Sequence, residues 1–291
     1  MGNAVELQNV HKSFGRFEIK DVTLQVKKGF VTGFIGANGA GKSTIIKMIM
    51  NLLQPDSGEI RVFGKSYKKN EKAIKERIGF VFNDNILYGD LALRDMKKLI
   101  APCYRQWDDY LFQQFCDRFE LPLKQNTKSF SDGMKMKASL AFALSHHAEF
   151  LIMDEPTSNL DPIFRREFID LLHDVMLDEQ KTILLSTHNM SDLSSFADYI
   201  TFIQKGQIVF SKEIHEIEEE YAIVRGGVDL LDRDTEQYFL AIRRADNRFE
   251  ALTAHYNTVK ELFGEEAIIE KASLEEIMYY TRGGKENASV N

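Results

Sequence analysis

The chain has 291 residues, of which 44% are hydrophobic and 28% are charged. These proportions match ordinary folded proteins, so they exclude wholesale disorder. The formal net charge is −7. This acidic balance argues against nucleic acid or an anionic lipid surface as the main partner, because both favour a basic protein surface. No apolar run approaches the length of about 18 residues that a membrane span needs, so we expect the chain not to cross a membrane.

The N-terminal part predicts strands, a glycine-rich loop and a helix. Residues 5–10 and 17–26 alternate apolar and polar side chains, which is the period of half-exposed strands. Residues 30–35 form a short β-rich run that leads directly into the glycine loop. Residues 42–53 carry a broad apolar face and predict a helix that Pro55 stops.

The predicted secondary structure changes twice in the middle of the chain. From about residue 85 to 148 helical periodicity replaces the strand pattern, which predicts a helical insertion. Strands and helices then alternate, and this rhythm predicts a parallel sheet. The expected elements are strands at 150–153, 182–186 and 199–204, and helices at 164–177 and 190–197.

Past residue 210 the sequence becomes acidic and loses this rhythm. We expect a main domain over residues 1–212 and a small α+β accessory region over 213–282. Helices are predicted there at 231–242 and 274–280. The polar end, residues 283–291, predicts a disordered tail.

One motif predicts a nucleotide site. Residues 36–44 read Gly-Ala-Asn-Gly-Ala-Gly-Lys-Ser-Thr and satisfy the phosphate-loop pattern G-x-x-x-x-G-K-[ST]. Its glycines let backbone amides point inward at phosphate oxygens, and the following helix adds its positive end. Lys42 can reach the β- and γ-phosphates, and the Ser43 hydroxyl can bind Mg²⁺. The candidate ATP-binding residues are Gly36, Asn38, Gly39, Ala40, Gly41, Lys42, Ser43 and Thr44.

A second motif narrows the reactions that the predicted nucleotide site could catalyse. The apolar run 150–153 ends in two carboxylates, Asp154 and Glu155. Successive strand residues point to opposite faces, so the two carboxylates need different roles. Asp154 suits Mg²⁺, held through water. Glu155 is then the candidate catalytic base that orients and deprotonates the attacking water, a role worth about 10²–10⁴-fold in rate.

With these motifs the chain resembles the nucleotide-binding subunit of an ATP-binding-cassette (ABC) transporter over residues 4–212. The family signature, usually LSGGQ, corresponds to residues 130–134, which begin 24 residues before Asp154. Ser131 is a natural helix N-cap there. The resemblance implies that the signature residues bind the ATP held by a partner subunit. These residues are Ser131, Asp132, Gly133 and Met134.

The same resemblance assigns four further residues. Ser158 and Asp161 match the D-loop, which crosses the dimer interface in the family. His188 matches the switch histidine that contacts the γ-phosphate, so it joins Glu155 as a catalytic candidate. Phe14 occupies the position of an aromatic residue that stacks on adenine.

Three positions depart from the family pattern. Asn83 stands where the family has the Q-loop glutamine, a ligand of ATP and Mg²⁺. It keeps the amide but loses about 1.5 Å of reach. Asp132 replaces a signature glycine and places negative charge near a triphosphate, so we expect its carboxylate to point away. Met134 replaces the signature glutamine.

For the fold, the resemblance implies an α/β P-loop NTPase with a mainly parallel sheet core. An N-terminal antiparallel β subdomain, a helical subdomain at about 85–148 and a small C-terminal α+β appendage complete it. For function, it implies an ATPase that uses ATP and Mg²⁺ and closes as a homodimer, or as a heterodimer with a paralogous ATPase subunit. A separate transmembrane permease subunit would hold it at the cytoplasmic face of the cell membrane.

Residues 135–137, 145–147 and 273–278 resemble an export branch of Firmicutes type, which includes the ATPases of the staphylococcal phenol-soluble modulin exporter. The resemblance implies export of a drug or of an antimicrobial or amphipathic toxin peptide. Two alternatives stay open. One is a nucleotide sensor that hydrolyses weakly because of Asn83 and Asp132. The other is a soluble ABC ATPase outside transport, which the acidic charge and the single cassette disfavour.

Overall fold

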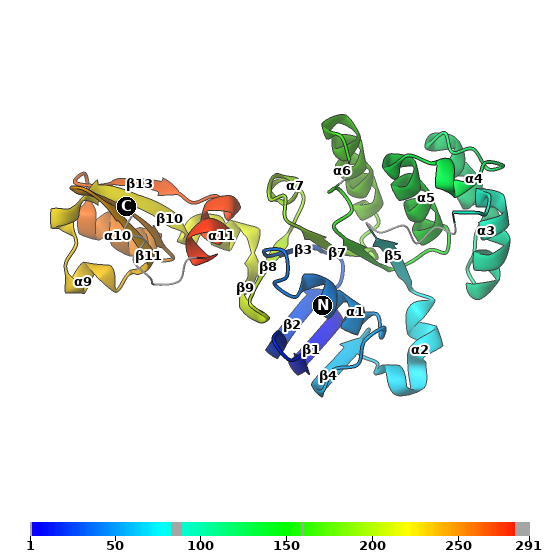
Figure 1. The fold of residues 1–291 in the computed structure, drawn as a ribbon, viewed down its shortest axis with the longest axis horizontal. Helices are drawn as coiled ribbons and strands as arrows, with labels where there is room; N and C mark the ends of the chain where they lie inside the picture. The colour runs from blue at the N-terminus through cyan, green and yellow to red at the C-terminus, as the bar shows by residue number, and fades with distance from the viewer. Residues whose placement is uncertain (1, 83–88, 159, 283–291) are drawn as a thin grey trace. The chain divides into compact units, whose positions relative to one another are not determined.

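The computed structural model describes residues 2–82, 89–158 and 160–282. They form two compact units, which divide the chain between Ser211 and Lys212. Figure 1 shows the elements of each unit. Across the described ranges, no helix is both long and apolar enough to cross a bilayer.

A six-stranded sheet forms the centre of the first unit, in the order β5-β6-β7-β3-β8-β9. The first five strands of that order are parallel neighbours, as predicted. Strands β3, β6 and β7 are buried along their whole length, which explains their apolar sequences. The bounds are β3 Val31–Ile35, β5 Ile78–Phe82, β6 Phe150–Asp154, β7 Thr182–Thr187, β8 Tyr199–Gln204 and β9 Gln207–Glu213.

The N-terminal residues form a separate antiparallel sheet of three strands, in the order β2-β1-β4. Its strands are β1 Asn3–Ser13, β2 Glu18–Lys27 and β4 Ser57–Val62. Their apolar faces share one core with helix α1 (Lys42–Ile49) and with the parallel sheet. The predicted helix 42–53 is too long: α1 ends at Ile49, and Asn51 then adopts the left-handed conformation with φ of 58°. Strand β4 and helix α2 (Tyr67–Lys75) were not predicted.

The helical insertion is confirmed over the described residues from 89 to 148. It contains α3 (Leu93–Ile100), α4 (Asp109–Arg118) and α5 (Asp132–Leu144). Helix α5 packs on β5. Helix α6 (Pro162–Met176) connects β6 to β7, and helix α7 (Ser191–Ser194) connects β7 to β8. Helix α7 is shorter than the predicted 190–197, because the chain turns at residues 195–196 to enter β8.

The second unit is an antiparallel sheet with the order β11-β12-β10-β13. The predicted helix at 231–242 is wrong. Asp232 and Thr235 form a capping box that starts a single turn, and a strand with buried Phe239 and Ala241 follows. The helix predicted at 274–280 is confirmed. The elements are α8 Ile214–Glu220, β10 Ala222–Gly227, α9 Arg233–Glu236, β11 Phe239–Ala245, β12 Arg248–Thr253, α10 Tyr256–Phe263, β13 Ile268–Lys271 and α11 Leu274–Arg282.

An ion pair joins the beginnings of β5 and β6. Arg77 Nε lies 2.7 Å from Glu149 Oε1, and Arg77 Nη2 lies 2.6 Å from Glu149 Oε2. The Arg77 hydrogen bonds hold the pKa of Glu149 below its ordinary value. A carboxylate with a depressed folded-state pKa stabilises the fold fully above its unfolded pKa, and this contribution is lost as pH falls through the folded pKa.

We therefore expect Glu149→Gln to lower the free energy of unfolding by about 1 kcal/mol at neutral pH. The difference from wild type should shrink as pH falls below the ordinary pKa of 4.5. Urea denaturation at neutral and acidic pH measures both effects. The exposed Glu179→Gln is the matched control and should change stability by less than about 0.5 kcal/mol. A pH-independent difference would contradict the ion-pair explanation.

Candidate active site

The phosphate loop connects the end of β3 to the start of α1 and is tightly enclosed by its neighbours. A Cβ on Gly36 would lie 2.5 Å from the carbonyl oxygen of Ile203, so a side chain does not fit there. Gly41, with φ of 116°, adopts a conformation that favours glycine, and its Cβ would meet Ile19 at 2.5 Å. Asn38 and Gly39, at the tip of the loop, are exposed.

Lys42 lies inside this loop. Its side chain is 5% exposed, and Nζ donates to the carbonyl oxygens of Gly36 at 2.8 Å and Ala37 at 3.5 Å. Nζ also lies 3.2 Å from Glu155 Oε1. The loop therefore wraps around an ammonium group that faces the acidic end of β6. Ser43 is exposed and Thr44 is half-buried on the first turn of α1.

Glu155 joins three separate segments of the chain. While Oε1 faces Lys42, Oε2 lies 2.6 Å from His188 Nδ1 and accepts from the His188 backbone N–H at 3.2 Å. The side chain of Glu155 is 18% exposed and that of His188 is 51% exposed. Glu155 itself has a left-handed φ of 53°, which turns its carboxylate out of the strand. The two predicted catalytic residues are thus in direct contact.

Asp154 is buried at the end of β6, and its Oδ1 accepts a hydrogen bond from Ser186 Oγ at 2.5 Å. Sequence reasoning missed Ser186. The available signal was a hydroxyl residue at the end of an apolar strand, two residues before His188.

The predicted magnesium ligands that the structure describes are Ser43 and Asp154. A hydroxyl and a carboxylate are hard oxygen donors, and they fit Mg²⁺, which usually takes one or two carboxylates together with substrate phosphates and water. The third predicted ligand, Asn83, lies outside the described residues.

Phe14 lies one aromatic ring away from the phosphate loop. Its ring stacks on Phe17 with centroids 6.3 Å apart, and Phe17 Cζ lies 3.3 Å from the position of a Cβ on Gly41. The Phe14 side chain is 48% exposed. A flat exposed ring beside the loop is able to stack on a base.

The signature residues lie at the start of α5. Ser131 is the N-cap, as predicted, and its Oγ accepts from the Met134 backbone N–H at 3.2 Å. Asp132 is 62% exposed and its Oδ1 lies 3.2 Å from Lys135 Nζ, which partly neutralises its charge. A Cβ on Gly133 would lie 3.3 Å from the ring of Phe164. The small residue therefore lets α5 pack closely on α6.

The D-loop residues connect Glu155 to α6. Ser158 Oγ donates to the Glu155 carbonyl oxygen at 3.1 Å. Asp161 is the N-cap of α6, and its Oδ1 accepts from the backbone N–H groups of Ile163 and Phe164 at 3.0 Å each.

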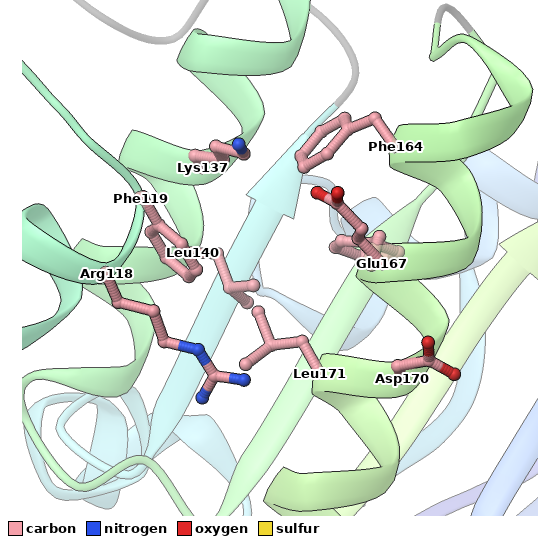
Figure 2. Close-up of a pocket in the computed structure, with 9 residues that line it drawn as sticks. Arg118, Phe119, Lys137, Leu140, Phe164, Glu167, Asp170 and Leu171 are labelled. Atoms are coloured by element: carbon pink, nitrogen blue, oxygen red, sulfur yellow. The ribbon is translucent and has the colours of Figure 1, made fainter.

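Among the hollows that adjoin the signature helix α5, two also contact the start of α6. One, of about 530 Å³, is lined by the signature residues 131–134 together with Asp161 and the start of α6. The other, of about 260 Å³, lies between α4, α5 and α6 (Figure 2). Phe164 lines both, and Lys137 Nζ lies 4.4 Å from the centroid of its ring. Neither hollow includes a residue of the phosphate loop 36–44. The predicted site residues thus fall into two groups, one around Lys42 and Glu155 and one at the start of α5.

Comparison with known proteins shows the family to which the chain belongs. The profile of the family described as ABC transporter matches residues 19–158. The bacitracin transport ATP-binding protein BcrA of Bacillus licheniformis is 33% identical over 214 residues, which are 72% of this chain and 69% of BcrA. The lantibiotic transport ATP-binding protein SrtF of Streptococcus pyogenes is 32% identical over 220 residues, covering 72% of this chain and 90% of SrtF.

A solved structure of the ATP-binding subunit of an ABC transporter is 26% identical, with a TM-score of 0.66. The match covers 74% of this chain and 92% of that one. The predicted relation to the phenol-soluble modulin exporter ATPases stays a prediction. The chain belongs to the ABC transporter family, as one of its ATP-binding, ATP-hydrolysing subunits.

Proposed function

We propose that this chain is the motor of an exporter and that it hydrolyses ATP in a closed dimer. The observation that carries the proposal is the contact of one carboxylate, that of Glu155, with both Lys42 and His188. In this arrangement the candidate base lies between the group that holds the γ-phosphate and the histidine that senses it. This pairing favours a hydrolysing motor over a nucleotide sensor that turns over weakly.

In the proposed cycle, the backbone amides of residues 36–44 and the Lys42 ammonium bind the triphosphate. Phe14 stacks on the adenine. Glu155 receives a proton from the attacking water, and His188 orients the Glu155 carboxylate and contacts the γ-phosphate. Ser43 and Asp154 would hold Mg²⁺, which would neutralise charge on the phosphates.

The signature group completes the site of a second subunit. Ser131 lies at an exposed helix N-terminus, where a hydroxyl and the adjacent amides favour an anion. We infer that it contacts the γ-phosphate bound by the partner, and that Ser158 and Asp161 lie at the same interface. ATP then stabilises the closed dimer, and hydrolysis releases it. The partner is a second copy or a paralogous ATPase.

For the cargo we propose a drug or an amphipathic peptide. The support is the likeness to BcrA and SrtF, whose names specify bacitracin and lantibiotic transport. A transmembrane permease would carry the cargo path and hold this chain at the cytoplasmic face of the membrane. Purification of the tagged chain from a detergent extract should recover this permease.

Lys42→Ala should weaken ATP binding by about 100-fold or more, because a charge-assisted contact to the phosphates is lost. Equilibrium binding of a fluorescent ATP analogue measures the loss. Lys47→Ala, which removes an exposed lysine from the same helix, is the control and should bind normally. Unchanged affinity in Lys42→Ala would rule out the phosphate-loop assignment.

Glu155→Gln should lower the ATPase rate by about 10²–10⁴-fold while ATP binding persists. Because the bound ATP is no longer cleaved, the variant should accumulate as a dimer in Mg²⁺-ATP on size-exclusion chromatography. The exposed Glu179→Gln should keep the wild-type rate. A wild-type chain that dimerises but does not hydrolyse ATP, even with its permease, would favour the sensor.

Ser131→Arg should leave ATP binding by each subunit intact. It should prevent dimer closure and turnover, because the arginine side chain would occupy the position of the γ-phosphate bound by the partner. Scattering of the protein with and without Mg²⁺-ATP measures closure. Ser57→Arg, at an exposed position of strand β4, serves as the control. Normal turnover of Ser131→Arg would count against a shared site.

A further inference from the structure

The buried hydroxyl of Ser186 contacts both residues of the carboxylate pair at the end of β6. Its Oγ lies 2.5 Å from Asp154 Oδ1 and 3.1 Å from the backbone N of Glu155. The side chain is fully buried. The sequence motifs described above do not include this residue, and the proposed cycle does not use it.

The register of the parallel sheet accounts for this position. Ser186 pairs with Asp154 on β6 and with Phe34 on β3. Side chains of paired residues in neighbouring strands lie on the same face of a sheet. The preceding pair on that face, Ile152 with Leu184, is apolar and buried. Phe34 offers no side-chain hydrogen-bond partner, so the hydroxyl turns to the carboxylate.

The direction of the two hydrogen bonds follows from the groups involved. A serine hydroxyl has one proton. The Glu155 amide can only donate, so Ser186 Oγ accepts there and gives its proton to Asp154 Oδ1. With Oδ1 held in this way, Oδ2 is the oxygen that would be available to hold Mg²⁺.

The Glu155 backbone does not depend on the hydroxyl alone. The Ser186 carbonyl oxygen also accepts from the Glu155 N–H, at 3.0 Å. Loss of the hydroxyl therefore leaves the left-handed turn at Glu155 anchored, whereas Asp154 loses the donor that orients it.

We propose that Ser186 is a positioning residue for the divalent cation: its hydroxyl holds the Asp154 carboxylate in the orientation that receives Mg²⁺. This inference rests on the proposed function, in which Asp154 faces the ion of the ATP complex. Loss of a hydrogen-bond partner behind a metal-facing group typically costs about 10–100-fold in metal affinity or activity.

The test compares Ser186→Ala with the rescue variant Ser186→Thr in the full chain. Mn²⁺ replaces Mg²⁺ as an electron paramagnetic resonance probe, and free Mn²⁺ is titrated in the presence of AMP-PNP. We expect the Mn²⁺ dissociation constant to rise about 10-fold or more in Ser186→Ala and to return close to wild type in Ser186→Thr. Nucleotide affinity measured in EDTA should be the same in all variants.

Thr182→Val is the matched control. Thr182 is a fully buried hydroxyl residue at the opposite end of β7, where its Oγ1 accepts from the Gly29 N–H at 3.0 Å. Its removal should affect stability without changing Mn²⁺ binding. An equal weakening of Mn²⁺ binding by Thr182→Val and Ser186→Ala would mean that general destabilisation is the cause, and it would overturn the proposal.

Two further outcomes are decisive. Wild-type Mn²⁺ binding by Ser186→Ala would overturn the inference while leaving the proposed ATPase intact. A wild-type chain that binds no Mn²⁺ with AMP-PNP and shows no Mg²⁺-dependent hydrolysis would instead reject the proposed function. Should Ser186→Ala fail to fold, the nearly isosteric Ser186→Cys, whose thiol is a weak donor, must also weaken Mn²⁺ binding.

Discussion

The carboxylate of Glu155 is the group on which the site depends. One of its oxygens faces Lys42 and the other faces His188, so it connects the segments that follow β3, β6 and β7. These strands are parallel neighbours, and their carboxyl ends meet at one edge of the sheet. The buried apolar strands hold that edge rigid, and a rigid edge is what positions a charged group for catalysis.

A second group of residues is organised by helix packing. Ser131 and Asp161 cap the first turns of α5 and α6, and Phe164 of α6 packs close to Gly133. Lys137 of α5 lies over the same ring (Figure 2). The start of α5 is therefore positioned by α6, whose N-cap follows Glu155 along the chain.

Local signals carried most of the successful predictions. The phosphate loop and the strand ending in Asp154 and Glu155 are contiguous motifs, so their chemistry is readable without distant contacts. The N-cap role of Ser131 is also local. The helix predicted at 231–242 failed because a single capped turn at Asp232 mimics a helix start. The strand that follows it is stabilised by pairing with β12, a partner that helical periodicity does not reveal.

The order of residues along the chain predicts what residues 36–44, 154–155 and 131–134 bind, because phosphate and metal recognition depends on residue types at short spacing. Which of them share a site was decided by folding. The sheet register brings Ser186 beside Asp154, and the parallel strand order brings His188 beside Glu155. These contacts join residues 32 and 33 positions apart in the sequence, and the direct pairing of β6 with β7 in the sheet brings them together.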